Sequence, residues 1–138
     1  MKKLIIILCC ILMVLPNTSF AETKVERGGY DLRFVSISRI SANFDITKSG
    51  KAIISSAVTT YPSAMDFIKL DVTLQKFDNG SWKPVKSWNA TSHINFCSID
   101  KQYYVMSGHQ YRTVTKVYTY KDGQVVETDT TITGSRYY

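Results

Sequence analysis

Strict alternation of apolar and polar residues, closed by a turn dipeptide, most constrains what this chain can fold into. Residues 68–75 read IKLDVTLQ, so apolar side chains fall on one face of an extended strand and polar side chains on the other. Asn79 and Gly80 follow, and both residue types tolerate the positive φ angles of a two-residue hairpin turn. The stretch predicts a β-hairpin with one buried face and one face toward water.

The turn also sets the register of this hairpin. With the turn at the tip, Phe77 pairs with Trp82, and Leu74 pairs with Val85. An aromatic pair across two strands stabilises a hairpin without any ligand. Packing alone can therefore explain Trp82.

Pro84 sets the second strand of the hairpin apart. Proline has no N–H to donate to a ladder, so this strand is predicted to lie at a sheet edge or to carry a bulge. A bulge would reverse the face from which the side chain of Trp88 emerges.

Further strands are predicted along the chain, and no stretch after residue 21 has a helical apolar period. Residues 30–46 read as a first strand that a bulge interrupts. Asp122-Gly123 repeats the turn signal and predicts a second hairpin. Its register pairs Tyr120 with Val125, Lys116 with Asp129 and Thr115 with Thr130.

We therefore expect an all-β chain of six to eight strands. Turns at this spacing favour two packed antiparallel sheets, an immunoglobulin-like or fibronectin-like β-sandwich, and a small closed β-barrel is the alternative. Gly108 and Tyr111 resemble a tyrosine corner at the start of the penultimate strand.

The first residues read as a secretory signal peptide. Lys2 and Lys3 precede an apolar run at 4–15, and small residues end at Ala21, after which we place the cleavage. A retained anchor is the alternative, but a membrane-spanning helix needs about 20 apolar residues. The predicted organisation is a signal peptide at 1–21, a polar segment at 22–29 and a β-sandwich domain at 30–138.

The cysteines and histidines offer little for catalysis. Cleavage would remove Cys9 and Cys10, which leaves Cys97 alone without an internal disulfide. His93 lies four residues away on the same expected strand, about 13 Å distant at strand rise, too far for a catalytic hydrogen bond. Metal-ligand spacings, phosphate-binding loops and nucleophile elbows are missing from the sequence. We expect no enzyme, no catalytic residue, no metal and no cofactor.

Binding is the remaining class of function. The candidate ligand-binding residues are aromatic: Phe77, Trp82, Trp88 and Tyr118. Exposed aromatic rings stack on sugars or anchor protein interfaces, although strands also select them for packing. The formal net charge of +6 is spread along the chain without a basic stripe, so no nucleic-acid partner is expected.

The expected function is an exported, non-enzymatic module that binds a protein or cell-wall glycan. We expect a monomer without a membrane span after cleavage, secreted or associated with the cell wall. One alternative is a secreted effector or inhibitor acting through loops such as 42–51. Another is a structural subunit that self-associates by strand addition along the edge near Pro84.

The chain also resembles a family of small exported proteins of uncharacterised function from Gram-positive, largely clostridial, bacteria. The resemblance rests on the following segments: GKA at 50–52, LQKFDNGSWKPVKSW at 74–88, YVMSG…YR at 103–112 and KVYTYKDGQVVET at 116–128. It covers residues 30–133 and implies a signal peptide followed by one immunoglobulin-like sandwich. It implies no activity, cofactor or catalytic residue.

Overall fold

The computed structural model describes residues 36–138, and all regular structure in them is β-strand. This confirms the predicted all-β class. The predicted signal peptide at 1–21, the segment at 22–29 and the first residues of the domain at 30–138 lie outside the described residues.

Eight strands form two antiparallel sheets. The small sheet has the order β1-β2-β5, and the large sheet has the order β4-β3-β6-β7 with β8 paired to β6. The bounds are β1 (Ile37–Ile46), β2 (Lys51–Thr60), β3 (Phe67–Asp78), β4 (Ser81–Ser92), β5 (Phe96–Tyr104), β6 (Gln110–Lys121), β7 (Gln124–Ile132) and β8 (Arg136–Tyr137).

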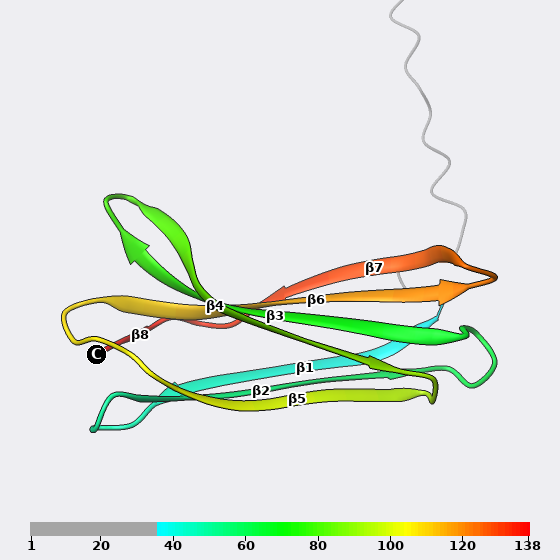
Figure 1. Ribbon diagram of the computed structural model, residues 1–138, viewed down its shortest axis with the longest axis horizontal. Helices are drawn as coiled ribbons and strands as arrows, with labels where there is room; N and C mark the ends of the chain where they lie inside the picture. Colours follow the sequence, from blue (N-terminus) through cyan, green and yellow to red (C-terminus); the bar gives the residue numbers. More distant parts are fainter. Residues whose placement is uncertain (1–35) are drawn as a thin grey trace, which may run out of the picture. The chain divides into compact units, whose positions relative to one another are not determined.

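The two sheets lie face to face (Figure 1). Both keep open edges among residues 36–138, so the chain is a β-sandwich of the immunoglobulin-like or fibronectin-like kind. The closed-barrel alternative is wrong, because no strand pairing joins one sheet to the other in this part of the chain.

Alternate residues of the strands meet between the sheets. Ile68, Leu70, Val72 and Leu74 of β3 are each 0% exposed, as the alternation predicts. Full burial of such a side chain contributes about 1.5–3 kcal/mol, so this strand supplies a large share of the core. The remaining buried apolar residues are Ile37, Phe44, Ala52, Ile54, Val58, Cys97, Ile99, Tyr111 and Val117.

Buried hydroxyl groups also cross between the sheets. Thr115 of β6 is fully buried, and its Oγ1 lies 2.8 Å from Oγ of Ser56 on β2. Thr119 Oγ1 lies 2.6 Å from Oγ of the buried Ser36. Because buried hydroxyls are costly without a partner, these pairs let β6 turn threonines toward the core.

Both predicted hairpin turns are present. Asn79 and Gly80 have φ angles of 50° and 79°, and Asp122 and Gly123 have φ angles of 50° and 72°. Positive φ at both central residues is what the mirror-image hairpin turn requires. Next to the turns, the predicted pairs Phe77–Trp82 and Tyr120–Val125 are confirmed.

A bulge in each hairpin shifts the register farther from the turn. In β4, Val85 is the extra residue, so Leu74 pairs with Lys86 and the predicted pair Leu74–Val85 is wrong. In β7, Val126 is the extra residue. The predicted pairs Lys116–Asp129 and Thr115–Thr130 are therefore each wrong by one position, and the observed pairs are Lys116–Thr130 and Thr115–Thr131.

The first strand begins with the predicted bulge, between Ile37 and Arg39. Beyond it, β1 pairs with β2 without interruption as far as Ile46. The region 42–51 is consequently not the loop that the effector hypothesis assumed: only residues 47–50 connect β1 to β2.

Tyr111 forms the predicted tyrosine corner. Its side chain is 2% exposed, and its hydroxyl donates to the carbonyl oxygen of Met106 at 2.8 Å. Gly108, with a φ of 85°, provides the turn between the two residues. Burial raises the pKa of Tyr111, so the hydroxyl stays a donor and ties the β5–β6 connection to β6.

The last residues return to the turn between β1 and β2. The ring of Tyr138 lies so close to Gly50 that a Cβ added there would be 2.6 Å from Cε1 of the tyrosine. Gly50 has a φ of 77°, and its carbonyl oxygen accepts the N–H of Val105 at 2.9 Å. Three distant segments of the chain therefore meet at this glycine.

Gly50→Ala should lower the free energy of unfolding by about 2 kcal/mol or more, because the left-handed conformation alone costs about 1–2 kcal/mol and the methyl group overlaps the Tyr138 ring. Urea denaturation measures the loss. Gly80→Ala is the matched control, since its φ is 79° and its added Cβ meets nothing within 4 Å. Equal losses in the two variants would contradict the close contact with Tyr138.

Candidate functional site

The bulge at Val85 places the two tryptophans on opposite faces of β4. Trp82 lies opposite Phe77, on the outer face of the large sheet, which points away from the small sheet. Trp88 lies opposite the buried Val72, packs against the core and makes an edge contact with Tyr103, with ring centroids 6.2 Å apart. The predicted candidates therefore separate: Phe77, Trp82 and Tyr118 share the outer face, and Trp88 does not.

Trp82 lies at the centre of one group of side chains, which we call the Trp82 cluster: Gln75, Phe77, Trp82 and Arg112. The rings of Phe77 and Trp82 are 5.2 Å apart and tilted by 57°. The guanidinium carbon of Arg112 lies 4.2 Å from the centre of the Trp82 ring, and Nε of Arg112 donates to Oε1 of Gln75 at 2.8 Å. Arg112 is therefore held over the ring, which favours a fixed orientation of Trp82.

Phe77 and Trp82 of the Trp82 cluster lie on a hairpin end that leaves the plane of the sheet, whereas Gln75 and Arg112 pair within the sheet. Figure 1 shows the β3–β4 turn bending out of the large sheet, on the side away from β1, β2 and β5. Lys83 donates to the Asp78 carboxylate at 3.2 Å and holds the pKa of Asp78 below its usual range. The outer face is thus bounded by a raised hairpin at one end.

A second group, the Tyr118 cluster, lies farther along the same face and comprises Lys69, Asp71 and Tyr118. Nζ of Lys69 lies 5.4 Å from the centre of the Tyr118 ring and 3.0 Å from Oδ2 of Asp71. The hydrogen bond to Asp71 raises the pKa of Lys69, which therefore stays charged. Beyond it, Phe67 and Tyr120 stack with centroids 4.2 Å apart.

Between the two clusters the face is polar and shallow. A hollow of about 290 Å³ lies over β4, β3 and β6. Two of its lining residues, Thr73 and Ser87, have their Oγ1 and Oγ atoms 2.9 Å apart. The other residues that line it are Asp71, Asn89, Lys116 and Tyr118, together with the apolar Val114 and Trp88. The arrangement offers hydrogen-bond donors and acceptors between two aromatic ends.

The sequence alone did not indicate several members of these clusters. Gln75, Lys69 and Arg112 are ordinary polar residues of alternating strands. A signal was present nonetheless, because each of the three residues alternates with buried residues along its strand and so points to the outer face. Lys69 pairs with Tyr118, and Gln75 pairs with Arg112. The pairing of β3 with β6 was needed to bring Arg112 beside Gln75.

Cys97 and His93 do not form a reactive pair. The Cys97 side chain is 4% exposed on the inner face of β5, and burial raises the pKa of its thiol. The His93 ring instead lies 5.7 Å from the Phe67 ring. Within residues 36–138, no group of three or more histidine, cysteine or acidic residues is placed to hold a metal ion.

Comparison of the sequence with models of protein families and with curated proteins found no match. The resemblance to small exported clostridial proteins therefore stays a prediction. Among the described residues, no helix is long and apolar enough to cross a membrane.

The two tryptophans should differ in their effect on stability. Trp88→Ala should lower the free energy of unfolding by about 2–3 kcal/mol, because it removes a ring packed on the core. Trp82→Ala should cost about 1 kcal/mol, the scale of cross-strand and cation–π contacts on an open face. Guanidinium denaturation of both variants tests the order. A larger loss of stability for Trp82→Ala than for Trp88→Ala would contradict the placement of Trp88 against the core and of Trp82 on the outer face.

Cys97 should react slowly in the folded protein. A thiol-specific reagent such as Ellman's reagent should modify it at a rate that rises with denaturant, because burial shields the sulfur and raises the pKa of the thiol. Ile99→Ala is a useful comparison, since it loosens the same buried face of β5 and should speed the reaction. Rapid labelling at a rate independent of denaturant would contradict the buried position of the thiol.

Proposed function

We propose that this protein is an exported, non-enzymatic binding module that holds a glycan on the outer face of the large sheet. The observation that carries the proposal is the order of side chains along that face: the Trp82 cluster, the polar hollow and the Tyr118 cluster. Sugar rings present an apolar face to aromatic side chains and hydroxyl groups at their edges, so they match such an alternation.

The length of the face favours an oligosaccharide over a single sugar. Arg112 and Tyr118 both lie on β6 on outward positions, six residues apart. At a strand rise of about 3.3 Å per residue they are separated by roughly 20 Å. A chain of several sugars can contact both ends at once, and the hairpin end gives the face a raised wall (Figure 1).

A glycan fits this surface better than a large protein interface does. Interfaces between proteins are centred on buried apolar anchors with a polar rim. Here Thr73, Ser87 and Asn89 line the central hollow beside one apolar residue of the outer face, Val114, and the rings of Trp82 and Tyr118 lie toward the two ends. A protein ligand remains the second form of the binding hypothesis, with Phe77, 39% exposed, as its anchor.

The remaining hypotheses receive less support from the geometry. An effector acting through the region 42–51 would have only residues 47–50 as a loop. Strand addition near Pro84 would meet a missing N–H and a bulge on the same strand. Export itself is a proposal that rests on the predicted signal peptide at 1–21, and with it we propose a partner outside the cell or on the cell wall.

The test is titration calorimetry of the protein with soluble oligosaccharides released from purified cell walls. Trp82→Ala should weaken binding by about tenfold, because loss of a stacking contact costs about 0.5–1.5 kcal/mol and the Arg112 guanidinium loses its support. Tyr118→Ala should weaken binding in the same direction.

Tyr104→Ala is the matched control. Tyr104 is 67% exposed on the small sheet and lies beside a lysine, Lys51, whose Nζ is 5.7 Å from the ring centre. It therefore copies the Tyr118–Lys69 arrangement on the other side of the molecule. Equal losses at Tyr104 and Tyr118 would contradict a site on the large sheet. Binding of a protein from the wall extract, with no glycan bound, would favour the protein-ligand form.

A further inference from the structure

Among residues 36–138, three of the four sheet edges carry features that oppose further strand pairing. Pro84 and a bulge interrupt β4, where Lys86 lies opposite a buried leucine. Lys101 of β5 lies opposite the buried Ile54, and Asp129 of β7 lies opposite the buried Val117. Charges at inward positions, prolines and bulges are the usual means by which proteins block edge strands.

The fourth edge strand, β1, is open. From Arg39 to Ile46 it pairs with β2 without a bulge, it contains no proline, and its inward residues are uncharged. Among residues 36–138, no strand pairs with its other side.

The register shows which backbone groups of β1 face this open side. The N–H of Thr47 donates to the carbonyl oxygen of Lys51. Because bonded and non-bonded pairs alternate along an antiparallel ladder, the odd-numbered residues of β1 direct their backbone groups to β2. The even-numbered residues Ile40, Ala42 and Phe44 therefore direct their N–H and C=O groups to the open edge.

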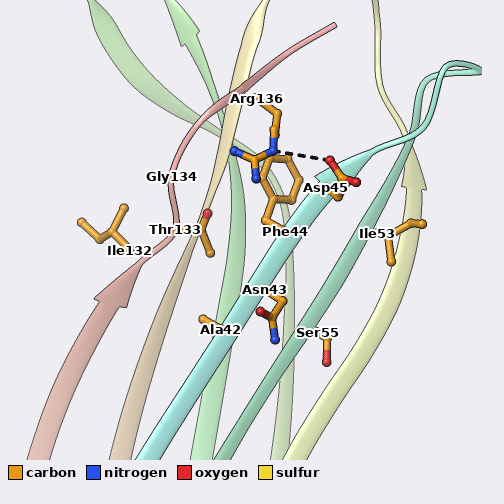
Figure 2. A pocket seen from close by; sticks show the side chains of 10 residues that line it. All are labelled: Ala42, Asn43, Phe44, Asp45, Ile53, Ser55, Ile132, Thr133, Gly134 and Arg136. Carbon is orange, nitrogen blue, oxygen red and sulfur yellow. Dashed lines mark hydrogen bonds and ion pairs between the residues drawn. The ribbon is translucent and has the colours of Figure 1, made fainter.

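A hollow of about 550 Å³ runs along the same edge. Figure 2 shows it between β1 and the segment that joins β7 to β8, with Ile132 and Thr133 on the far wall. Ile132 is 52% exposed there. Space and an exposed apolar side chain thus accompany the unpaired backbone.

We propose that β1 pairs with β1 of a second copy of this chain, antiparallel, about a two-fold axis through Ala42. In this register Ile40 lies opposite the partner's Phe44. The free N–H and C=O groups of the even-numbered residues in one copy therefore face those of the other copy and can bond to them. It also sets Arg39 opposite the partner's Asp45, twice over by symmetry.

The charges select this register among those that the backbone allows. Two neighbouring registers also let the free N–H and C=O groups of the two copies face each other. In these registers Arg39 lies opposite the partner's Asn43 or the partner's Thr47. Neither joins opposite charges, whereas the register through Ala42 joins two pairs. Both partners are available, since Arg39 is exposed and the Asp45 side chain is 74% exposed in its long contact with Arg136. A cross-strand pair of opposite charges is favourable, and like charges there are destabilising.

The two-fold pairing closes on itself, because each copy uses β1, the open edge found among residues 36–138. It therefore yields a dimer and not a fibre. The outer face of the large sheet is left free in this dimer. The dimer and the glycan site are therefore separate proposals, and a negative result for one does not affect the other.

The protein, produced from its full coding sequence and purified, should sediment as a concentration-dependent dimer. Arg39→Glu and Asp45→Arg should each weaken dimerisation by about tenfold, because each sets like charges against each other at two positions. The double variant, Arg39→Glu with Asp45→Arg, should restore it. Lys86→Glu is the matched control: it changes net charge as Arg39→Glu does, on the blocked edge, and should leave the dimer unchanged.

Ala42→Pro provides a test that does not depend on charge. The N–H that it removes faces the open edge, so the sandwich should fold with an unchanged circular dichroism spectrum while the dimer is lost. A protein that is monomeric at all concentrations would overturn the proposal. Equal weakening by Lys86→Glu, or no rescue in the double variant, would do the same. A monomer with the Ala42 amide protected from hydrogen exchange would overturn it as well, because the edge would then be covered without a second copy.

Discussion

The burial of one side of β3 is the constraint on which the rest of the structure depends. This strand lies inside the large sheet, between β4 and β6, and its four inward residues are fully buried. The chain has no disulfide among its described residues, so the sandwich is held by burial and backbone pairing. Because side chains alternate, the same burial directs every second residue of β3 toward the outer face. The candidate site is therefore a consequence of the core: Gln75, Thr73 and Asp71 lie half-buried on the outer face because Leu74 and Val72 are buried on the inner face.

The bulge at Val85 is the second determinant. Without it, Trp82 and Trp88, which are separated by an even number of residues, would share a face of β4. With it, one ring joins Phe77 and Arg112 outside, and the other joins Tyr103 between the sheets. One inserted residue thus places one of two similar side chains on the outer face and the other against the core. It also disrupts the β4 edge and so opposes strand pairing there.

Local patterns predicted the elements well and the long-range arrangement less well. The alternation at 68–75, both hairpin turns and the tyrosine corner depend on residues close together in sequence, and all four are found. The pairings beyond the bulges were wrong by one residue, because the position of an extra residue is decided by packing across the sheet. Pro84 signalled a bulge without indicating which residue would be unpaired.

The site was harder to predict than the fold for a related reason. The aromatic members were recognisable as residue types, but Arg112 reaches Trp82 only because β6 lies beside β3. Trp88 was indistinguishable from Trp82 as long as the bulge was unplaced. The polar hollow has no sequence signature, since Thr73, Ser87 and Asn89 are common strand residues on an exposed face.

The separation of the two tryptophans has a spectroscopic consequence. Indole emission depends on the polarity around the ring, and the two rings occupy different surroundings on opposite sides of one strand. Trp88, packed against the core, reports on the integrity of the sandwich. Trp82, beneath the Arg112 guanidinium on the open face, reports on what occupies that face. The chain therefore carries an internal reference and an internal sensor in its own two fluorophores.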